Sequence, residues 1–374
     1  MIELKEICKV QCGFAFDSKK FTEDSSYYPL IRIRDVKRGF TQTYYTGEFS
    51  SEYIVHKGDL LVGMDGEFNI ARWNSDDALL NQRVCRIITN NNTNEEYLRF
   101  YLKRTLKHIE SKTSFVTVKH LSAKELNSLK LNLPCIEDQQ RISKQLSTLE
   151  LMIRKNKQVL ELLDELVKAR FVEMFGDPIE NQKNWQIVKI RDIVTDVRYG
   201  TSKPAVEGGK YPYLRMNNLT VDGGLDLSDL KYIDIPDNEI EKCVVRKGDI
   251  LFNRTNSIDL IGKTAVFNLL DDMVIAGYII RIRLNDQILP DVFSQYMNLE
   301  AMKKVLKGMA KGAVNQANIN AQELQSIKVY IPNMELQKQY VEFKEEIDKS
   351  RSRIQKSLEA SQELFDSLMQ EYFG

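Results

Sequence analysis

The sequence has none of the short motifs that mark most nucleotide-using or DNA-modifying enzymes. It contains no Gly-x-x-x-x-Gly-Lys-Ser/Thr loop, no Gly-x-Gly-x-x-Gly loop and no Gly-x-Ser-x-Gly elbow. The Asn/Asp-Pro-Pro-aromatic motif of adenine methyltransferases is missing as well. A nuclease site of the Pro-Asp…Glu-x-Lys type would have to use Glu342 and Lys344, which fall in a predicted helix rather than a sheet. We therefore expect a chain that catalyses no reaction alone.

Histidine and cysteine are scarce. The chain has 3 histidines and 5 cysteines, with no Cys-x-x-Cys pair and no histidine near Cys8 and Cys12. This argues against a zinc centre and against a disulfide-dense scaffold. No apolar run approaches the roughly 18 residues of a membrane helix, and no secretory leader is evident. We expect a cytoplasmic protein with no membrane contact, metal or cofactor of its own.

A charge excess of either sign is also absent. The 53 basic and 53 acidic side chains give a formal net charge of zero. A nonspecific DNA-binding protein usually shows a basic excess, because it neutralises phosphates. The chain therefore binds DNA through local clusters with a partner's help, or does not bind it.

What the sequence does contain is a long internal repeat. Residues 121–134 are echoed by 319–332, and each copy is followed by a Glu-x-Gln element, Glu137–Gln139 and Glu335–Gln337. A weaker echo relates residues 56–61 to 246–251. A repeat of this length is stronger evidence of architecture than local propensity. It predicts two similar units related by a pseudo-two-fold axis.

Each unit is predicted to be a head followed by a long helix. The expected domains are head one (residues 1–135), a central helix (136–176), head two (177–332) and a C-terminal helix (333–374). The heads are predicted to be α+β, mixed and rich in strands. Strands are expected at 28–34, 84–88, 211–217 and 278–282 and from Leu60 and Ile250; helices are expected at 95–110 and 291–307.

The two long helices carry apolar residues in +4/+3 steps. In the first helix the series is Ile142, Leu146, Leu149, Ile153, Asn156, Leu160, Leu163, Val167, Arg170 and Met174. In the second it is Tyr340, Lys344, Ile347, Arg351, Ile354, Leu358, Ser361, Phe365, Leu368 and Tyr372. This is the pattern of a coiled-coil seam, and repeat symmetry makes the paired helices antiparallel. The alternative is that each helix folds back on its own head.

Polar, basic and aromatic residues gather in the predicted loops of both heads. Arg reads guanine and Asn or Gln reads adenine, while Lys, Ser and Thr hold phosphates. Candidate DNA-binding residues in head one are Ser18, Lys19, Lys20, Arg32, Arg34, Gln82, Arg83, Ser114 and Lys119. Those in head two are Tyr199, Thr201, Lys203, Arg215, Asn217, Asn253, Arg254, Thr255, Asn256, Asn315 and Gln316. Any one of them can instead be a solvated loop residue or a cap. Corresponding loops of the two heads nevertheless carry different residues, although the surrounding scaffold of the heads matches.

These features together resemble the specificity subunit of type I restriction-modification systems. The resemblance spans the chain and rests on the turns at 57–61 and 247–251, the segments 121–134 and 319–332, the Glu-x-Gln helix starts, and the junction Met174-Phe-Gly-Asp-Pro178. The second copy has Asn333-Met where the family often has Pro-Pro-like variants, and no Asp-Pro after Gly374.

The resemblance implies a non-catalytic subunit with two target recognition domains separated by an antiparallel pair of conserved helices. It implies double-stranded DNA, two methyltransferase subunits and the restriction subunits as partners. S-adenosylmethionine, ATP and Mg²⁺ are then expected on those partners, and adenine N6 as the methylated atom. Each head would read one half of an asymmetric bipartite site, with the helices setting the spacer.

Two other functions remain open on the sequence. One is a specificity subunit for a fused restriction-methylation enzyme outside type I, which gene neighbours would distinguish. The other is a protein-binding scaffold, which would leave duplex DNA unshifted when purified with its partner.

Overall fold

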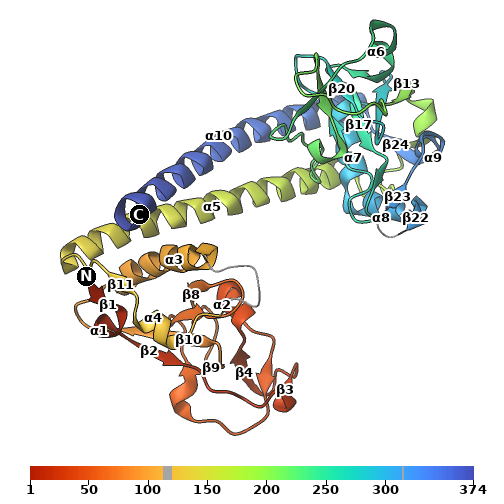
Figure 1. The fold of residues 1–374 in the computed structure, drawn as a ribbon. Coiled ribbons are helices and arrows are strands. Elements are labelled where there is room, and N and C mark those ends of the chain that lie inside the picture. The colour runs from red at the N-terminus through yellow and green to blue at the C-terminus, as the bar shows by residue number, and fades with distance from the viewer. Residues whose placement is uncertain (113–119, 314–315) are drawn as a thin grey trace. The chain divides into compact units, whose positions relative to one another are not determined.

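A computed structural model describes residues 1–112, 120–313 and 316–374 and divides the chain into two compact units. Unit 1 comprises Met1–Asn156 and Lys356–Gly374, and unit 2 comprises Lys157–Gln355. The division crosses both long helices, α5 (Ile136–Phe175) and α10 (Met334–Phe373), so each unit holds one head and a segment of each helix. Both heads mix helices and strands (Figure 1).

The described residues of head one form three sheets. Their strand orders are β1 (Ile2–Glu3) with β11 (Lys130–Leu131); β2 (Cys8–Cys12), β10 (Val84–Thr89), β7 (Leu60–Gly63) and β8 (Asn69–Arg72); and β3 (Phe21–Thr22), β5 (Tyr44–Tyr45), β4 (Tyr28–Ile31), β9 (Ala78–Leu80) and β6 (Ile54–Val55). The helices are α1 (Leu4–Ile7), α2 (Ile33–Arg38), α3 (Glu95–Lys112) and α4 (Ala123–Asn127). Leu60 and Val62 of β7 pack with Leu98 of α3 in the main core, as strand alternation requires.

In head two, leaving out residues 314–315, the strands form four sheets. Their strand orders are β12 (Gln186–Lys189) with β24 (Lys328–Ile331); β13 (Val194–Tyr199), β21 (Ile279–Leu284), β17 (Ile250–Asn253) and β19 (Thr264–Val266); β15 (Lys231–Ile233), β14 (Tyr211–Leu214), β20 (Met273–Ile275) and β16 (Val244–Val245); and β18 (Thr255–Asn256), β23 (Gln316–Asn318) and β22 (Lys311–Ala313). The helices are α6 (Asp237–Cys243), α7 (Pro290–Asn298), α8 (Glu300–Met309) and α9 (Ala321–Ser326).

The sheets of the two heads repeat one topology. In head one β10 pairs antiparallel with both β2 and β7, and in head two β21 pairs antiparallel with both β13 and β17. Each head also contains one parallel pair, β4 with β9 and β14 with β20. The predicted Lys-Gly-Asp turns precede β7 and β17, and Gly58 and Gly248 adopt φ values of 99° and 92°, which favour glycine. The two-unit repeat read from the sequence is thus present in the fold.

Two predicted strands end early. The alternating patterns at residues 28–34 and 211–217 predict strands throughout, but β4 ends at Ile31 and β14 ends at Leu214. The reason is a side-chain cap, because the N–H of Arg32 donates to Asp35 Oδ2 and that of Arg215 donates to Asn218 Oδ1, each at 2.9 Å. The chain therefore turns into a short helix in both heads.

The helix predicted at 291–307 is two helices. Leu299 is buried and extended, with ψ of 146°, and separates α7 from α8. The Asn298 side chain donates to the carbonyls of Thr264 and Ser294, at 2.5 and 3.0 Å. Periodicity alone cannot reveal this break, because the competing acceptor on Thr264 lies on a distant strand.

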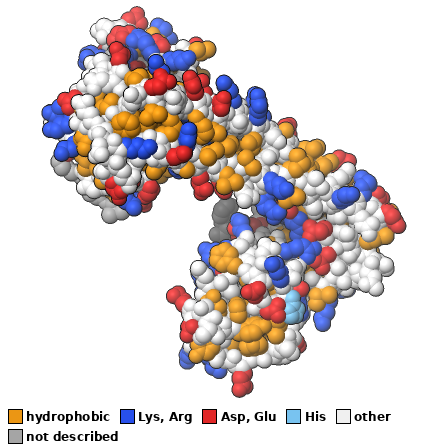
Figure 2. All heavy atoms as spheres, turned by 180° about the vertical axis from the view of Figure 1, so that it is seen from behind, with side chains coloured by type: hydrophobic (Ala, Val, Ile, Leu, Met, Phe, Trp, Pro, Cys, Tyr) orange, Lys and Arg blue, Asp and Glu red, His pale blue; other side chains and the backbone are white. Residues whose placement is uncertain are grey.

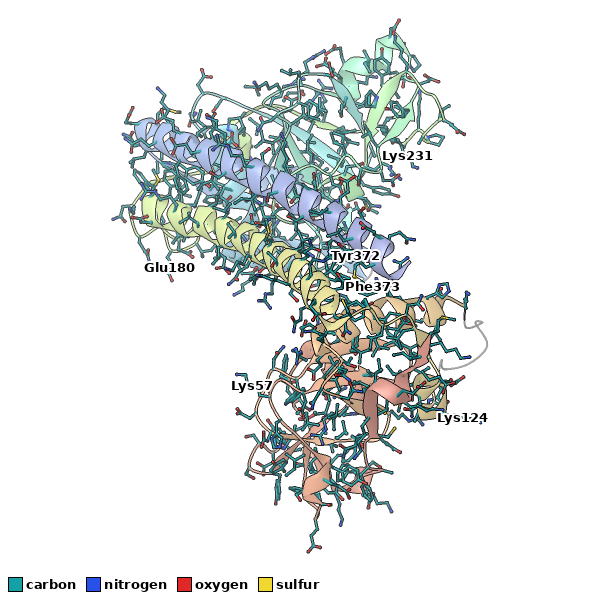
Figure 3. The ribbon with its side chains drawn as sticks, turned by 90° about the vertical axis from the view of Figure 1, so that its left-hand side faces the viewer. Lys57, Lys124, Glu180, Lys231, Tyr372 and Phe373 are labelled. Carbon is teal, nitrogen blue, oxygen red and sulfur yellow. The ribbon has the colours of Figure 1, made fainter. Side chains whose placement is uncertain are left out.

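In unit 1, the first part of α5 packs against the last part of α10 and against α3. Phe100 of α3 and Phe365 of α10 have ring centroids 6.0 Å apart, in one cluster with Ile142 and Leu146 of α5. Tyr372 donates to Gln145 at 3.0 Å (Figure 3). The beginning of α5 thus lies beside the end of α10, so these segments run in opposite directions.

In unit 2, the last part of α5 packs against the first part of α10. Phe171 and Phe175 lie edge-on to the Tyr340 ring, with centroid distances of 5.4 and 5.5 Å. All three side chains belong to the main core of head two. Gly176 then ends α5 with φ of 85° before Asp177-Pro178. Every seam position predicted in the two long helices is buried or half-buried.

The repeated Glu-x-Gln element has a structural role that its sequence did not reveal. In unit 1, Gln139 is 1% exposed; its side chain accepts from the Asn94 N–H at 2.8 Å and donates to the carbonyls of Pro134 and Asn92, at 2.9 and 3.3 Å. We call this arrangement the Gln latch. It ties the start of α5 to the segment that opens α3.

The same latch is present in unit 2. Gln337 is fully buried; it accepts from the Leu289 N–H at 2.8 Å and donates to the carbonyls of Pro332 and Gln287, at 2.9 and 3.0 Å. The latch therefore fixes each head to the helix that follows it, and it defines which residues of the two repeats are equivalent.

None of the described helices combines the length and the apolarity needed to cross a bilayer.

Candidate nucleic-acid interface

The two heads present an arginine from the same backbone turn. Arg32 follows β4 and Arg215 follows β14, and the capping bonds to Asp35 and Asn218 give both turns one geometry. Arg32 is exposed, whereas Arg215 donates to Asp229 Oδ2 at 2.7 Å. The frame is thus shared, while the partners of the two guanidinium groups differ.

Five of the predicted residues in head one gather around β3. Ser18, Lys19 and Lys20 form an exposed 3₁₀ turn directly before this strand. Arg32 and Arg34 line an open hollow of about 690 Å³ beside it. The hollow is further lined by Phe21, Thr22, Glu23, Gln42, Thr43 and Tyr44. A basic rim, an amide and aromatic rings are the groups that hold phosphates and read base edges.

Gln42 and Tyr44 were missed by sequence reasoning. Gln42 is exposed and Tyr44 is half-buried in this hollow. Their signal was available, because they stand in a polar and aromatic stretch soon after the Arg32–Arg34 turn. Strand pairing of β5 with β3 and β4 brings them to the arginines.

The remaining head-one candidates lie elsewhere. Gln82 and Arg83 occupy an exposed turn before β10, where Arg83 has φ of 74° and pairs with Asp65. Asp65 also contacts His120, so the Arg83 charge is partly engaged within the head. Ser114 and Lys119 lie outside the described residues.

In head two, Arg254 and Tyr199 form a stacked pair. The Arg254 guanidinium lies 4.8 Å from the Tyr199 ring centroid, and the Tyr199 hydroxyl accepts from the Ala321 N–H at 2.8 Å. Stacking of this kind holds the planar guanidinium in one orientation. The pair joins β13, the segment after β17 and the start of α9.

Two residues of the stretch Asn253–Asn256, all four predicted to bind DNA, have buried side chains. Asn253 is fully buried, and its amide has no hydrogen-bond partner among the described residues. Thr255 is 8% exposed and donates to Asn318 at 2.8 Å. The stretch belongs to strands β17 and β18 rather than to a loop, so alternate side chains face the interior. Arg254 and Asn256 are the half-buried members that remain accessible.

The other head-two candidates are dispersed. Lys203 pairs with Glu239 at 2.8 Å, and this cation holds the pKa of the Glu239 carboxyl below its usual value. Thr201 is half-buried, and its hydroxyl accepts from the Lys203 N–H at 3.2 Å. Asn217 is exposed beside Arg215. Asn315 lies outside the described residues, and Gln316 is placed only as a backbone position of β23.

Comparison with known proteins gives one consistent result. A family model described as the type I restriction modification DNA specificity domain matches residues 1–165 and 182–362. The EcoBI specificity subunit of the type I restriction enzyme from Escherichia coli is 30% identical over 96% of this chain and 81% of that protein.

Two solved structures share the fold. The S subunit of a type I restriction-modification system from M. genitalium has a TM-score of 0.63 at 14% identity, covering 100% of this chain and 95% of the other. A chain from a structure of complex assembly and conformational transition in the type I system has a TM-score of 0.55 at 17% identity, with coverages of 100% and 96%.

Proposed function

The chain belongs to the family of type I restriction-modification specificity subunits, non-catalytic subunits that recognise DNA, and from that premise we propose that each head reads one half of a bipartite site. The observation that carries the proposal is the repeated arginine turn. Arg32 and Arg215 leave equivalent strands with the same cap, yet the next polar residues are Arg34 in one head and Asn217 in the other. The same backbone turn carrying different polar side chains in the two heads supports recognition of two different half-sites. We take residues 1–135 and 177–332 as the recognition domains.

The long helices are proposed to set the spacer between the half-sites as an antiparallel coiled coil. Support comes from each unit, where segments of α5 and α10 pack through their seam positions. Forty residues of helix span roughly 60 Å. A DNA turn repeats about every 34–36 Å, so a support of this length is compatible with two heads about one turn apart.

A second face of α5 is proposed to bind the methyltransferase subunits. Val159, Leu162 and Leu166 are 38%, 54% and 46% exposed in unit 2, although the seam face of this helix is already covered. Figure 2 shows hydrophobic side chains at the surface along the long helices. An apolar row at helical spacing outside the seam fits the amphipathic helices of a partner. We propose two such subunits carrying S-adenosylmethionine for adenine-N6 methylation, and restriction subunits carrying ATP and Mg²⁺ for cleavage.

The test is methylation of a DNA library with randomised positions by the complex of this chain with its methyltransferase subunits. Arg254→Ala is expected to relax the sequence preference in one half-site only, and Arg34→Ala in the other only. Loss of a direct base contact costs about 1–3 kcal/mol of discrimination, or roughly 5- to 150-fold. Lys124→Ala is the control, since this exposed lysine lies on α4, outside the candidate surface (Figure 3).

Equal relaxation of both half-sites by either variant would contradict the assignment of one head to one half-site. A complex that neither shifts nor methylates duplex DNA would instead favour a protein-binding scaffold.

A further inference from the structure

Each head meets its own long helix at a junction of two carboxylates. The Gln latch makes Glu96 of α3 equivalent to Asp291 of α7, each two residues after the latched N–H of Asn94 or Leu289. It likewise makes Glu150 of α5 equivalent to Asp348 of α10. Both repeats therefore place one acid on the head and one on the helix.

In unit 1 the cation between these acids comes from the head. Arg99 of α3 bonds Glu96 at 2.8 Å and Glu150 at 2.6 Å, and its side chain is only 11% exposed. Burial works to lower the pKa of Arg99, but Glu150 and Glu96 outweigh it, so the pKa is raised overall. Lys103, also on α3, bonds Glu150 at 2.8 Å. The head thus neutralises the acid of the helix.

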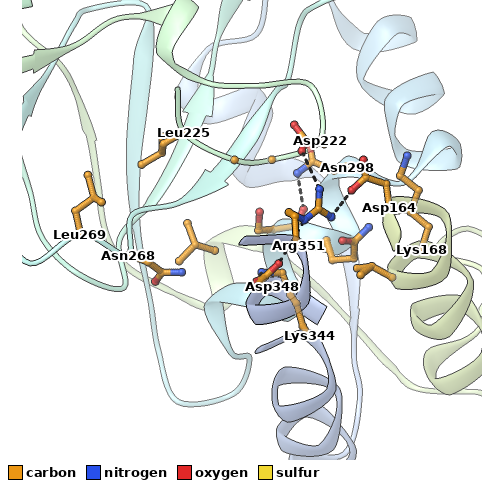
Figure 4. Close-up of a pocket in the computed structure, with 16 residues that line it drawn as sticks. Asp164, Lys168, Asp222, Leu225, Asn268, Leu269, Asn298, Lys344, Asp348 and Arg351 are labelled. Carbon is orange, nitrogen blue, oxygen red and sulfur yellow. Dashed lines mark hydrogen bonds and ion pairs between the residues drawn. The ribbon is translucent and has the colours of Figure 1, made fainter. Parts of the chain in front are cut away.

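In unit 2 the cation comes from the helix. Lys344 of α10 bonds Asp291 at 3.0 Å and Asp348 at 2.9 Å. Burial works to lower the pKa of Lys344, but the two aspartates outweigh it, so the pKa is raised overall. In Figure 4, Lys344 and Asp348 lie with Arg351 beside a cavity of about 300 Å³. Arg351 pairs with Asp164 of α5 and approaches Asp222 of a head-two loop at 4.0 Å.

The two positions that lack a cation complete the pattern. The residue equivalent to Arg99 in head two is Ser294, a buried side chain that donates to the Thr264 carbonyl at 3.1 Å. The residue equivalent to Lys344 in the first long helix is Leu146, which is fully buried in an apolar cluster. In both repeats one cation therefore bridges the two carboxylates of the junction. In unit 1 this cation belongs to the head, and in unit 2 it belongs to the long helix.

We propose that Arg99 and Lys344 are positioning residues that make each head pack on its own long helix in preference to the other one. We call this preference keying. Head two seated on α5 would bring Asp291 against Glu150 with Ser294 and Leu146 between them, and no bridging cation. Head one seated on α10 would instead bring both Arg99 and Lys344 to the junction. Unpaired, partly buried carboxylates are strongly unfavourable, so the first exchange is rejected more strongly than the second. This inference rests on the proposed function. The preference of each head for its own helix then determines which half-site is read at which end of the spacer.

The test moves the cation across the junction in the full-length chain. Lys344→Leu is expected to lower the thermal unfolding midpoint by several degrees, because Asp291 then loses its cation and faces Asp348, which keeps only Arg351 at 3.8 Å. Adding Ser294→Arg, which copies the arrangement of unit 1, is expected to recover at least half of that loss. Lys349→Leu on the exposed face of α10 is the matched control and is expected to leave the midpoint unchanged.

The mirror pair is Arg99→Ser with Leu146→Lys in unit 1. If Lys344→Leu does not yield folded protein, Lys344→Leu with Asp291→Asn keeps the test open, since removing one carboxylate is expected to restore folding. The keying is overturned if neither Ser294→Arg nor Leu146→Lys restores the unfolding midpoint of its partner variant. It is also overturned if the midpoint of Lys344→Leu equals that of the control.

Head exchange tests the asymmetry directly. A chain with residues 177–332 in both head positions is expected to unfold at lower temperature than one with residues 1–135 in both, and Leu146→Lys is expected to stabilise only the former. The reverse order overturns the proposal. Unfolding needs no DNA, so loss of methylation with intact thermal rescue would count against the proposed function and leave the keying standing.

Discussion

Asn253 shows how strand alternation decides which polar side chains reach solvent. In the stretch 253–256 every residue type can contact DNA, yet Asn253 and Thr255 face the interior and Arg254 and Asn256 do not. The amide of Asn253 is buried with no partner in the described part of head two. Composition could predict the polar stretch, but its inward and outward members depend on the pairing of β17 with β19 and β21 and of β18 with β23.

Replacing Gln139 is predicted to destabilise unit 1. Gln139→Ala leaves the N–H of the half-buried Asn94 and two carbonyls without their partner, at a cost of roughly 1–3 kcal/mol. The expected readout is faster amide hydrogen exchange at Asn94 and a lower unfolding midpoint. Gln140→Ala is the control, because its neighbouring side chain is exposed and should change stability by less than about 0.5 kcal/mol. Equal effects of the two substitutions would refute the latch.

Lys303 is predicted to make unit 2 more stable as pH rises above neutrality. Burial, with help from Lys263, lowers the pKa of Lys303 to about 7, and its amine donates to the Gly262 carbonyl and to Asn298, at 2.6 and 2.7 Å. The unfolded lysine titrates near 10.4, so the unfolded chain binds more protons between these pH values, and stability rises with pH across that window.

The comparison is between wild type and Lys303→Met over pH 7 to 9. The wild-type midpoint is expected to rise relative to that of the variant across this range. Lys304→Met, an exposed neighbour, should follow the wild type. Parallel pH profiles for wild type and Lys303→Met would show that this amine does not titrate in the window.

At the scale of elements, α5 has two apolar faces: the buried seam, and the exposed row that we propose as the docking surface. Leu162→Glu combined with Leu166→Glu places charges on the exposed face, outside the seam. We expect at least tenfold weaker binding of the methyltransferase subunits, about 1.4 kcal/mol, with unchanged helix content. Gln158→Glu adds a charge at an exposed polar position and should leave binding intact. Undiminished binding by the double variant would exclude this face as the docking surface.

At the scale of the molecule, the repeat could be predicted because two segments of the sequence are similar. The long helices could be predicted because their apolar residues recur in +4/+3 steps. The central helix predicted over 136–176 is present as Ile136–Phe175, and the strands beginning at Leu60 and Ile250 are present as predicted. The details that failed depend on side-chain hydrogen bonds, either to a backbone N–H three residues away or to the carbonyl of a strand distant in sequence. The caps at Asp35 and Asn218 shorten two strands, and neither has a signal in hydrophobic alternation.

The candidate site was also only partly predictable. Arg32 and Arg34 were predicted from residue type, whereas Gln42 and Tyr44 join them through strand pairing. The exchanged cations Arg99 and Lys344 became visible only once the Gln latch had aligned the two repeats.

Unit 1 is assembled from two separated stretches of chain, Met1–Asn156 and Lys356–Gly374, whereas unit 2 is one continuous stretch. During synthesis the whole of unit 2 is therefore translated before Phe365, Met369 and Phe373, which complete the cluster beneath α3. Domains generally fold in the order of their synthesis. Here the order of completion is reversed: the head that is translated first is the last to have its support in place, and until then Tyr97 and Phe100 lack those aromatic partners.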